Sequence, residues 1–420
     1  MRYLYTVLFY LSLPLILLRL FWRSRRLPGY RERIGERFGF CSHQLPQCIW
    51  LHAVSVGETI AAIPLIKSLQ QTYPNIPLLV THMTPTGAAR LKAVFGDTVL
   101  QAYVPYDLPG AWRRFLKRVH PKCVVIMETE LWPNLFASCR IQNIPLIVTN
   151  ARLSQKSAEG YQKIGALTRE MFSALHQIAA QSIADADRFK LLGLPDDKIT
   201  ITGNLKFDLE IPDNLFSAAD SLRDELGVDR LILIAASTHP SEEEIVLKAF
   251  RQIHAKEPRA LLILVPRHPD RFEIVATLCK DQQFKMARRS QKERCSPETD
   301  IYLGDTMGEL LLLYAASDVA LIAGSFAQIG GHNMLEAAAM HKPILSGPVL
   351  FNFTEVSQLL LNASGMTVVQ DANELSQIVL KLFADPTQRA KMGENAYQVV
   401  KANKGALQKQ MEVIRTVMLT

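Results

Sequence analysis

The sequence is poor in the motifs by which many metal and nucleotide sites are recognised. Its 420 residues include six cysteines, which form no CxxC pair and no zinc-ligand spacing, and no Walker or calcium-loop pattern occurs. A disulfide framework and a metal or other cofactor are therefore not expected. Cys123 and Cys139 lie in apolar or helical contexts, so buried free thiols in a reducing compartment such as the cytoplasm are predicted.

The composition is that of a globular protein with a basic balance. Hydrophobic residues make up 48% of the chain, which excludes wholesale disorder, and the length suffices for two domains with separate cores. The formal net charge of +7 suits an anionic membrane surface, a phosphorylated substrate or nucleic acid.

A long apolar run opens the chain. Residues 3–18 carry no charge, Arg19 interrupts, and the run continues to Trp22, a length near the lower limit for crossing a bilayer. Arginines follow at positions 23, 25, 26, 31, 33 and 37. We predict a single membrane anchor in residues 1–22 and a basic juxtamembrane segment in residues 23–47, with the rest of the chain on the cytoplasmic side. A cleaved signal peptide is the less favoured alternative, because the positive charge follows the apolar run and no small-residue cleavage site is seen.

Apolar runs alternate with helical patterns in the remainder of the chain. The runs expected to form strands are residues 49–53, 77–81, 122–127, 145–149, 178–181 and 199–202, and then 230–236, 260–265, 300–303, 319–323 and 343–346. Strands that are apolar on both faces and separated by helices indicate parallel sheets. We predict an α/β fold with two Rossmann-like domains, residues 48–208 and 217–395, that face a cleft. Residues 209–216 are the expected linker, and a C-terminal helix over 396–420 can cross back to the first domain.

One glycine-rich motif is especially informative: Gly324-Ser-Phe-Ala-Gln-Ile-Gly-Gly-His-Asn-Met-Leu-Glu336. It lies between a buried strand and the helical pattern at 337–340. Glycine there lets the backbone approach a ligand, and free amides can receive phosphate. Glu336 can accept hydrogen bonds from a pair of ribose hydroxyls. The motif predicts a sugar-nucleotide site without a metal, although an ordinary turn with a helix-start acid has the same pattern.

Carboxylates follow the strands of the first half. Glu58 ends the motif His52-Ala-Val-Ser-Val-Gly-Glu58 and can act as a general base towards a sugar hydroxyl, or can simply favour the helix start. Glu128, Glu130 and Trp132 follow the third strand, where unpaired carboxylates are costly, so a functional role is favoured. Further candidates for the acceptor side are Gly57, Thr84, Thr86, Arg90, Asn150 and Arg152. Threonine capping explains the threonines nearly as well. Lys206 follows the last strand and can reach the cleft.

Candidate donors of hydrogen bonds follow the strands of the second half. Arg267 offers a permanently charged fork for phosphate or carboxylate, whereas His268 is ambiguous because a lone histidine is more often structural. Exposed amides at Met307, Gly308 and Glu309 can read a base edge or hold a phosphate. The remaining candidates for donor or phosphate binding are Ser237, Thr238, His239, Gly324 and Ser325.

Seven motifs occur in order along the chain. They are His52-Ala-Val-Ser-Val-Gly-Glu58, Glu128-Thr-Glu-Leu-Trp-Pro-Asn134, Asn150-Ala-Arg-Leu-Ser154, Gly203-Asn-Leu-Lys-Phe-Asp208, Pro266-Arg-His-Pro269, Gly304-Asp-Thr-Met-Gly-Glu309 and Gly330-Gly-His-Asn-Met-Leu-Glu336. Together they resemble the transferases of 3-deoxy-D-manno-octulosonic acid (Kdo) in lipid A biosynthesis. The resemblance covers nearly the whole chain, including the N-terminal anchor.

This resemblance implies a GT-B glycosyltransferase of lipopolysaccharide biosynthesis. Such an enzyme moves Kdo from CMP-Kdo to the lipid A precursor lipid IVA at the cytoplasmic face of the inner membrane, with inversion and without a metal. By matching position, Glu58 is the general base towards the 6′-hydroxyl of the distal glucosamine, and Glu128 and Lys206 support the transition state. The residues implied to contact CMP are Pro266, Arg267, Met307, Gly308, Glu309, Asn333, Met334, Leu335 and Glu336. The basic segment is expected to help hold the bisphosphorylated lipid.

Other functions fit parts of the pattern. The absence of proline in Ala337-Ala-Ala-Met340 departs from the Leu-Glu-Pro-Ala pattern expected there, which should affect packing more than chemistry. Another membrane-associated GT-B enzyme that uses a different nucleotide sugar is the main alternative, and the Glu-Thr-Glu-Leu-Trp-Pro-Asn motif argues against it. Intact Glu58, Arg267 and Glu336 argue against a nonenzymatic binding protein. Nucleic-acid binding is not expected, because the basic residues lie mostly beside the apolar run. No obligate protein partner is indicated.

Overall fold

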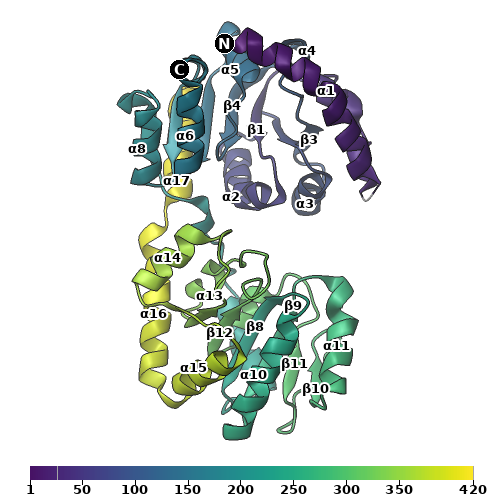
Figure 1. The fold of residues 1–420 in the computed structure, drawn as a ribbon, viewed down its shortest axis with the longest axis vertical. Helices are drawn as coiled ribbons and strands as arrows, with labels where there is room; N and C mark the ends of the chain where they lie inside the picture. Colours follow the sequence, from purple (N-terminus) through teal and green to yellow (C-terminus); the bar gives the residue numbers. More distant parts are fainter. Residues whose placement is uncertain (26, 420) are drawn as a thin grey trace. The chain divides into compact units, whose positions relative to one another are not determined.

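The computed structural model describes residues 1–25 and 27–419, so Arg26 of the predicted basic segment lies outside the described residues. The chain divides into two compact units. Unit 1 comprises Met1–Asp208 and Lys404–Thr420, and unit 2 comprises Leu209–Asn403. Figure 1 labels their helices and strands.

Unit 1 is built on a seven-stranded parallel sheet with the order β3-β2-β1-β4-β5-β6-β7. The strands are β1 (Cys48–His52), β2 (Leu78–His82), β3 (Leu100–Tyr103), β4 (Pro121–Met127), β5 (Leu146–Ala151), β6 (Gln177–Ala180) and β7 (Ile199–Ile201). The direction in which successive strands are added reverses between β1 and β4. The crevice beyond the carboxyl ends of two such strands is where ligands bind in open α/β sheets.

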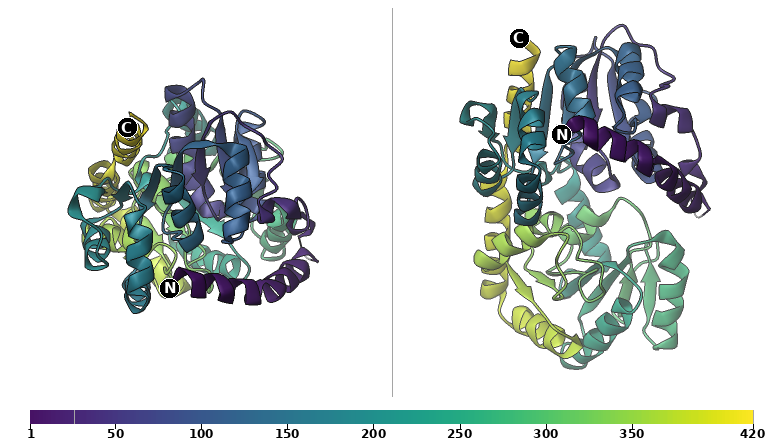
Figure 2. Two further views of the ribbon diagram at one scale, coloured as in Figure 1. Left: turned by 90° about the horizontal axis from the view of Figure 1, so that it is seen from above. Right: turned by 45° about the horizontal axis from the view of Figure 1, so that its top comes forward.

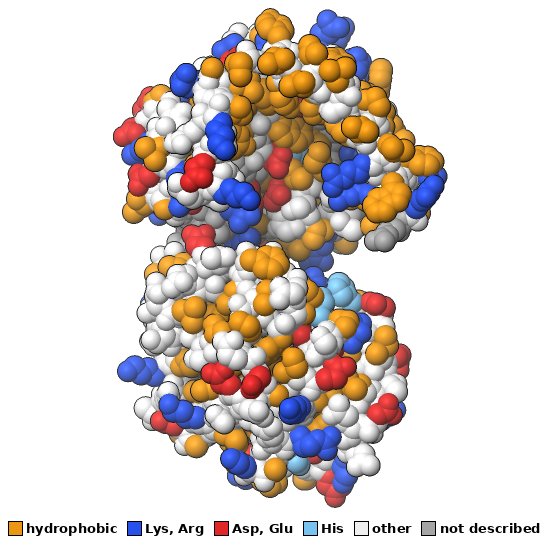
Figure 3. Space-filling view, viewed as in Figure 1, with side chains coloured by type: hydrophobic (Ala, Val, Ile, Leu, Met, Phe, Trp, Pro, Cys, Tyr) orange, Lys and Arg blue, Asp and Glu red, His pale blue; other side chains and the backbone are white. Residues whose placement is uncertain are grey.

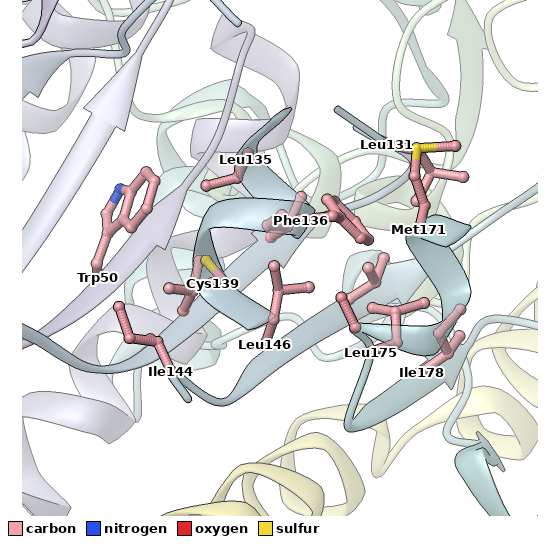
Figure 4. Packing of buried hydrophobic residues seen from close by; sticks show 14 of the residues in the cluster. Trp50, Leu131, Leu135, Phe136, Cys139, Ile144, Leu146, Met171, Leu175 and Ile178 are labelled. Carbon is pink, nitrogen blue, oxygen red and sulfur yellow. The ribbon is translucent and has the colours of Figure 1, made fainter. Parts of the chain in front are cut away.

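Helices cover both faces of this sheet. They are α2 (Val56–Thr72), α3 (Pro85–Phe95), α4 (Pro109–Val119), α5 (Pro133–Ile141), α6 (Gln155–Lys163), α7 (Gly165–Ser173), α8 (Ile183–Leu191) and α17 (Ala406–Leu419). Successive strand residues point to opposite faces, so Ile49 and Leu51 pack with α2, α3 and α17, whereas Trp50 packs with α4 and α5. Figure 4 shows part of the core on the Trp50 side of the sheet, where Leu135 and Phe136 of α5 lie against β-strand residues such as Leu146.

The N-terminal helix α1 (Arg2–Ser24) packs along unit 1 by one face. Phe9, Leu13, Ile16 and Leu17 contact an apolar cluster that includes Tyr106, Leu108 and Ala111. The other face is exposed and apolar, with residues Tyr3, Leu4, Val7, Leu8, Tyr10, Leu11, Leu15, Leu18, Phe21 and Trp22. Figure 3 shows this band of hydrophobic side chains where α1 runs in Figure 1. Length and composition make α1 the one helix of the described chain that is long and apolar enough to cross a membrane.

Polar contacts tie α1 to its neighbours. The Tyr5 hydroxyl donates a hydrogen bond to buried Asp107, and Thr6 Oγ1 donates to Asn134 Oδ1 at 3.1 Å. Asp107 also accepts the backbone N–H of Asn134 at 3.1 Å. Arg2 pairs with Glu170 at 3.0 Å. These polar contacts, together with the apolar ones, show that α1 is docked on the rest of unit 1.

Unit 2 repeats the architecture with a second seven-stranded parallel sheet, in the order β10-β11-β9-β8-β12-β13-β14. Its strands are β8 (Ile232–Thr238), β9 (Leu261–Pro266), β10 (Met286–Arg288), β11 (Ile301–Leu303), β12 (Val319–Ile322), β13 (Ile344–Ser346) and β14 (Met366–Val368). Its helices are α9 (Leu215–Leu226), α10 (Glu242–Lys256), α11 (Phe272–Asp281), α12 (Leu310–Ala315), α13 (Leu335–Ala339), α14 (Thr354–Asn362), α15 (Ala372–Ala384) and α16 (Pro386–Asn403). The order reverses between β8 and β12, which marks the second candidate ligand position. Figure 2 gives two further views of the ribbon.

The prediction of two parallel-sheet, Rossmann-like domains is confirmed. Strands β3, β10 and β14 were not predicted, and all three lie at sheet edges, where short strands have weak apolar patterns. The helix expected over residues 396–420 is instead the end of one helix, α16, and a second helix, α17, separated at Gly405 with φ of 95°. Residues 1–47, predicted as separate segments, belong to unit 1, and Lys404 rather than residue 396 begins the return to it.

One residue of the basic segment has a structural role that the sequence did not suggest. Arg37 is buried, donates to the carbonyl of Met83 at 3.1 Å and lies over the ring of Tyr103 at 4.4 Å. It is therefore not available to lipid phosphate. All six cysteines are free thiols, and Cys123 and Cys139 are buried as predicted.

Candidate functional site

Glu58 lies in the first turn of α2, directly after the central strand β1 of unit 1. Ser55 caps this helix, accepting the Glu58 N–H at 3.3 Å and donating its hydroxyl to Glu58 Oε1 at 2.9 Å. The backbone N–H of Val54 donates to Oε2 at 2.9 Å. These bonds orient the carboxylate. Burial raises the pKa of Glu58, and nearby Glu128 raises it further against the lowering effect of the hydrogen bonds. A carboxylate with a raised pKa is a suitable general base.

Glu128 follows β4 at the same reversal of strand order. Its backbone is left-handed, with φ of 55°, and its N–H donates to the carbonyl of Thr149 at 2.9 Å. The Arg152 guanidinium reaches Glu128 Oε2 at 3.0 Å, and the Glu128 side chain is only 13% exposed. A left-handed non-glycine residue stores strain that often marks a functional position. Here it turns a carboxylate towards the same region as Glu58.

Glu130 completes a group of three carboxylates. Trp132 Nε1 donates to Glu130 Oε2 at 2.8 Å, and the indole ring lies 5.1 Å from the ring centroid of His52. Burial raises the pKa of Glu130 to about 7, and the charges of Glu58 and Glu128 add to the effect. Glu130 can therefore carry a proton near neutral pH and donate a hydrogen bond, while an adjacent carboxylate accepts one.

The loops after β5 and β7 are tied together beside these carboxylates. Asn150, with φ of 49°, accepts the Leu205 N–H on Oδ1 at 2.9 Å. Asn204 Oδ1 accepts the Lys206 N–H at 3.0 Å, so Lys206 follows β7 on a short turn, η4 (Leu205–Phe207), that contacts α2. The structure thus positions the backbone of Lys206 in unit 1 through two asparagine side chains.

The predicted residues on the α3 side take more ordinary positions. Thr84 caps α3 by accepting the Gly87 N–H at 3.2 Å, which is the capping role that the sequence left open. Thr86 and Arg90 are exposed on α3, and Gly57 is exposed at the start of α2.

His52 is a buried residue of this region that sequence reasoning did not select. Burial lowers its pKa to about 3, and its Nδ1 lies 2.8 Å from Thr81 Oγ1. Its Nε2 has no hydrogen-bond partner within the described chain. The residue begins the motif that ends at Glu58, so its position in that motif was the available signal. A neutral histidine under Trp132 supports the position of the indole ring.

Glu336 is the principal acidic residue of the predicted nucleotide site in unit 2. It lies in α13, half-buried, and its Oε1 accepts a hydrogen bond from Asn333 Nδ2 at 3.2 Å. Burial raises the pKa of Glu336, and the nearby Arg267 charge opposes this shift. The side chains of Met334 and Leu335 are fully buried, so a ligand can meet these two residues only through the backbone.

Met307, Gly308 and Glu309 follow β11. Met307 is exposed and Gly308 is left-handed with φ of 85°. The Glu309 carboxylate is occupied by Arg289, which donates from Nη2 at 2.7 Å and from Nε at 3.2 Å, and this pairing lowers the Glu309 pKa. Arg289 was not selected from the sequence, because it lies in a segment without a recognised motif. The Glu309 side chain therefore shapes the loop, and its carbonyl accepts the Leu313 N–H at 3.1 Å.

The turn after β12 departs from the prediction. Its amides were expected to be free for phosphate, but those of Gly324 and Ser325 donate to the fully buried carboxylate of Glu242 at 2.7 and 3.0 Å. Ser325 Oγ is also occupied, donating to the Ile322 carbonyl at 2.8 Å and accepting the Gly347 N–H at 2.8 Å. Because these groups are already satisfied, Gly324 and Ser325 do not offer donors to an external phosphate. Glu242 lay in an acidic helix start and was not recognised as their partner.

Three histidine rings gather where β8, β9 and β12 end. His239 Nε2 and His332 Nε2 are 2.7 Å apart, and their rings stack with centroids 4.9 Å apart. The His268 ring meets His239 edge-on at 5.5 Å. Among the remaining candidates, Ser237 is left-handed with φ of 62°, Thr238 is buried, and Pro266 ends β9. No group of three or more potential metal ligands is positioned to hold an ion among residues 1–25 and 27–419.

Comparison with known proteins identifies the family of the chain. Residues 32–209 match the family described as 3-deoxy-D-manno-octulosonic-acid transferase (kdotransferase), and residues 218–399 match glycosyl transferases group 1. A 3-deoxy-D-manno-octulosonic acid transferase of Haemophilus influenzae is 45% identical over 99% of this chain and 98% of its own. The chain belongs to the Kdo transferase family.

Two further comparisons extend over most of this Kdo transferase. The Bordetella pertussis 3-deoxy-D-manno-octulosonic acid transferase is 36% identical over 96% of each chain. Among solved structures, the UDP-GlcNAc 2-epimerase of Neisseria meningitidis bound to UDP-GlcNAc superposes with a TM-score of 0.58 at 15% identity, covering 88% of this chain and 100% of that one. At this identity the likeness shows the shared two-domain GT-B fold alone. The prediction of a Kdo transferase with this fold is confirmed.

Proposed function

We propose that the protein transfers Kdo from CMP-Kdo to lipid IVA with inversion of the anomeric centre and without a metal ion. The observation that carries the proposal is the Glu58 carboxylate, held by Ser55 and Val54 at the strand-order reversal of unit 1 with a raised pKa. A partly buried, oriented base of this kind is what an acceptor hydroxyl needs for direct displacement. Membership of the Kdo transferase family supplies the sugar.

In the proposed reaction Glu58 takes the proton of the acceptor hydroxyl. The oxygen then forms a bond to the anomeric carbon of Kdo, on the face opposite to the leaving group. The bond from that carbon to the phosphate oxygen breaks, and CMP leaves with the electron pair. Glu128 and Lys206, both placed by strand-end turns of unit 1, are proposed to stabilise charge in the transition state.

CMP is proposed to bind to unit 2. Glu336 receives the ribose hydroxyls, the Arg267 guanidinium binds the phosphate, and the backbone of residues 307–309 reads the base. Pro266 and the segment from Asn333 to Leu335 are proposed to complete the contacts. A single phosphate held by a guanidinium needs less compensation than a diphosphate, which supports a metal-free mechanism.

The acceptor is proposed to reach unit 1 from the inner membrane surface. The docked helix α1 presents its exposed apolar face, which includes Leu8, Leu11 and Leu15, to the lipid on the cytoplasmic side. Because the opposite face packs on unit 1, we propose that α1 lies in the plane of the interface and does not span the bilayer. Glu130, Trp132, Asn150 and Arg152 of unit 1 are proposed acceptor contacts, whereas exposed Arg90 and Thr86 are available for lipid phosphate.

The test is the incubation of the purified full chain, in detergent and EDTA, with lipid IVA and freshly generated CMP-Kdo. Mass spectrometry of the lipid should show stepwise addition of Kdo, and the number of steps gives the number of sugars transferred. No addition with an intact donor would contradict the proposal, and addition abolished by EDTA and restored by a divalent ion would contradict its metal-free form.

A further inference from the structure

Unit 2 contains a group of three histidines that the proposed CMP contacts do not use. His239 and His268 directly follow β8 and β9, and His332 lies in the loop between β12 and α13. The Arg267 N–H donates to the carbonyl of Thr238 at 3.0 Å, next to His239. Burial is the main cause that lowers the pKa of His239 and His332, and the Arg267 charge adds to it. Histidine side chains can be seen gathered at the surface of this unit in Figure 3. His268 is exposed, His332 is half-buried and His239 is buried, so the group leads from the surface inwards.

The close contact of two rings limits how many protons the group can hold. With Nε2 atoms 2.7 Å apart, one nitrogen must donate and the other accept, since two N–H groups cannot face each other at this distance. The pair can therefore carry one shared proton at this edge. Without an anion, burial and the neighbouring positive charges lower the His332 pKa to about 4 and keep the ring neutral. A bound anion would reverse that balance and allow one positive charge.

The backbone is built to hold the two rings together. The Glu242 carboxylate accepts the His239 N–H at 3.1 Å and the Gly324 N–H at 2.7 Å, so one buried anion joins both segments. Gly324, with φ of 73°, passes directly over the His332 ring, and a Cβ there would lie 2.7 Å from His332 Cδ2. Glycine at this position therefore makes room for the ring.

The charges of the donor match this arrangement. A CMP-linked sugar acid carries two separate negative charges, one on its phosphodiester and one on the carboxylate of the sugar. Arg267 supplies one permanent positive charge, and the histidine pair supplies a second one when it takes up a proton. CMP linked to a neutral sugar would carry only the phosphodiester charge and would need only the first.

We propose that His239, His268 and His332 form the subsite for the carboxylate of the donor sugar acid, next to the Arg267 that binds the phosphate. This inference rests on the proposed function, because it takes a CMP-linked sugar acid as the donor. The histidines would then discriminate between an acidic and a neutral donor sugar. The alternative ligand for the histidines is the phosphate of the nucleotide, which is also negatively charged.

The test is direct binding in the absence of acceptor. Dissociation constants of CMP and of CMP-Kdo are measured by calorimetry for the wild-type chain, His332→Gln and His268→Gln. Each variant should raise the dissociation constant of CMP-Kdo by about tenfold, the scale of one charge-assisted hydrogen bond, and change that of CMP by less than about twofold. Exposed His268 guards against a folding defect, and His341→Gln is the matched control, since His341 pairs with Glu394 elsewhere in unit 2.

Equal weakening of CMP and CMP-Kdo would overturn the inference by assigning the histidines to the phosphate. Weakening of CMP alone, or of neither ligand, would also overturn it. The result is independent of turnover. A wild-type chain that binds CMP-Kdo but transfers no sugar would contradict the proposed function, and the histidine result would still stand or fall on the binding data.

Discussion

The carboxylate of Glu242 accepts the backbone N–H of Gly324 at 2.7 Å and thereby closes the turn that follows β12. Four further N–H groups, those of His239, Ser325, Phe326 and Ala327, also point at this carboxylate. A strand-end turn of this kind commonly binds the phosphate of a ligand. In this protein a side chain of the same unit occupies that position and makes the turn rigid.

Replacement of this carboxylate should be costly. Glu242→Gln removes the charge and turns an amide NH₂ group towards backbone donors, so we expect a loss of about 2–4 kcal/mol in the free energy of unfolding. Chemical denaturation measures this loss. The control is Glu244→Gln, an exposed residue of the same helix, which should change stability by less than about 0.5 kcal/mol. Equal effects of the two substitutions would contradict the role given to Glu242.

The sequence was sufficient for the parts of the structure that depend on local patterns. Buried parallel strands read as continuous apolar runs, so the central strands and the carboxylates that follow them, Glu58 and Glu128, could be predicted. The pairing of Glu242 with Gly324 could not, because it joins residues 82 positions apart in the sequence. The contact of His239 with His332 depends on the same long-range folding. Arg37 was misassigned because a buried arginine with a carbonyl partner has the same sequence pattern as a surface one.

Gly324 should tolerate no side chain. Gly324→Ala places a Cβ 2.7 Å from the His332 ring at a φ of 73°, so strain and displacement of the ring add. We expect a loss of more than about 2 kcal/mol in the free energy of unfolding. Gly308→Ala is the control for strain alone, because Gly308 has φ of 85° with nothing within 4 Å of the added Cβ. Equal losses in the two variants would show that the His332 contact has no cost.

Glu130 should make stability depend on pH. Its pKa is about 7 in the folded protein against 4.5 ordinarily, so between these values the folded state binds more protons than the unfolded one. Stability contributed by this proton is therefore lost as the pH rises from about 4.5 to about 7. We compare the free energy of unfolding of Glu130→Gln with that of wild type. This difference should shift in favour of the variant by about 1–3 kcal/mol between pH 4 and pH 8, allowing for partial solvent screening.

The measurement for Glu130 is urea denaturation of both proteins at the two pH values. Glu159→Gln, an exposed acid of α6, should show no such pH-dependent gain. A Glu130→Gln difference that is the same at both pH values would mean that Glu130 titrates in its ordinary range.

The exposed face of α1 should determine membrane binding. Leu11 and Leu15 are 71% and 70% exposed, so the double substitution to glutamine should leave folding intact and weaken vesicle binding by about tenfold or more per residue. Flotation with vesicles of anionic phospholipid measures this. Ile141→Gln on α5, where the side chain is 71% exposed, is the control for loss of exposed apolar surface away from α1. Unchanged flotation of the double variant would contradict the proposed orientation of α1.

The role of Glu58 is the central claim. Its most direct test is the mass of lipid IVA after incubation with CMP-Kdo and either the wild-type chain or Glu58→Gln, with CMP affinity measured in parallel. We predict that the wild type adds Kdo. The variant should bind CMP normally, but its rate of Kdo addition should fall by about 100-fold or more, the scale expected for loss of a general base. Near-normal Kdo addition by Glu58→Gln would contradict the account.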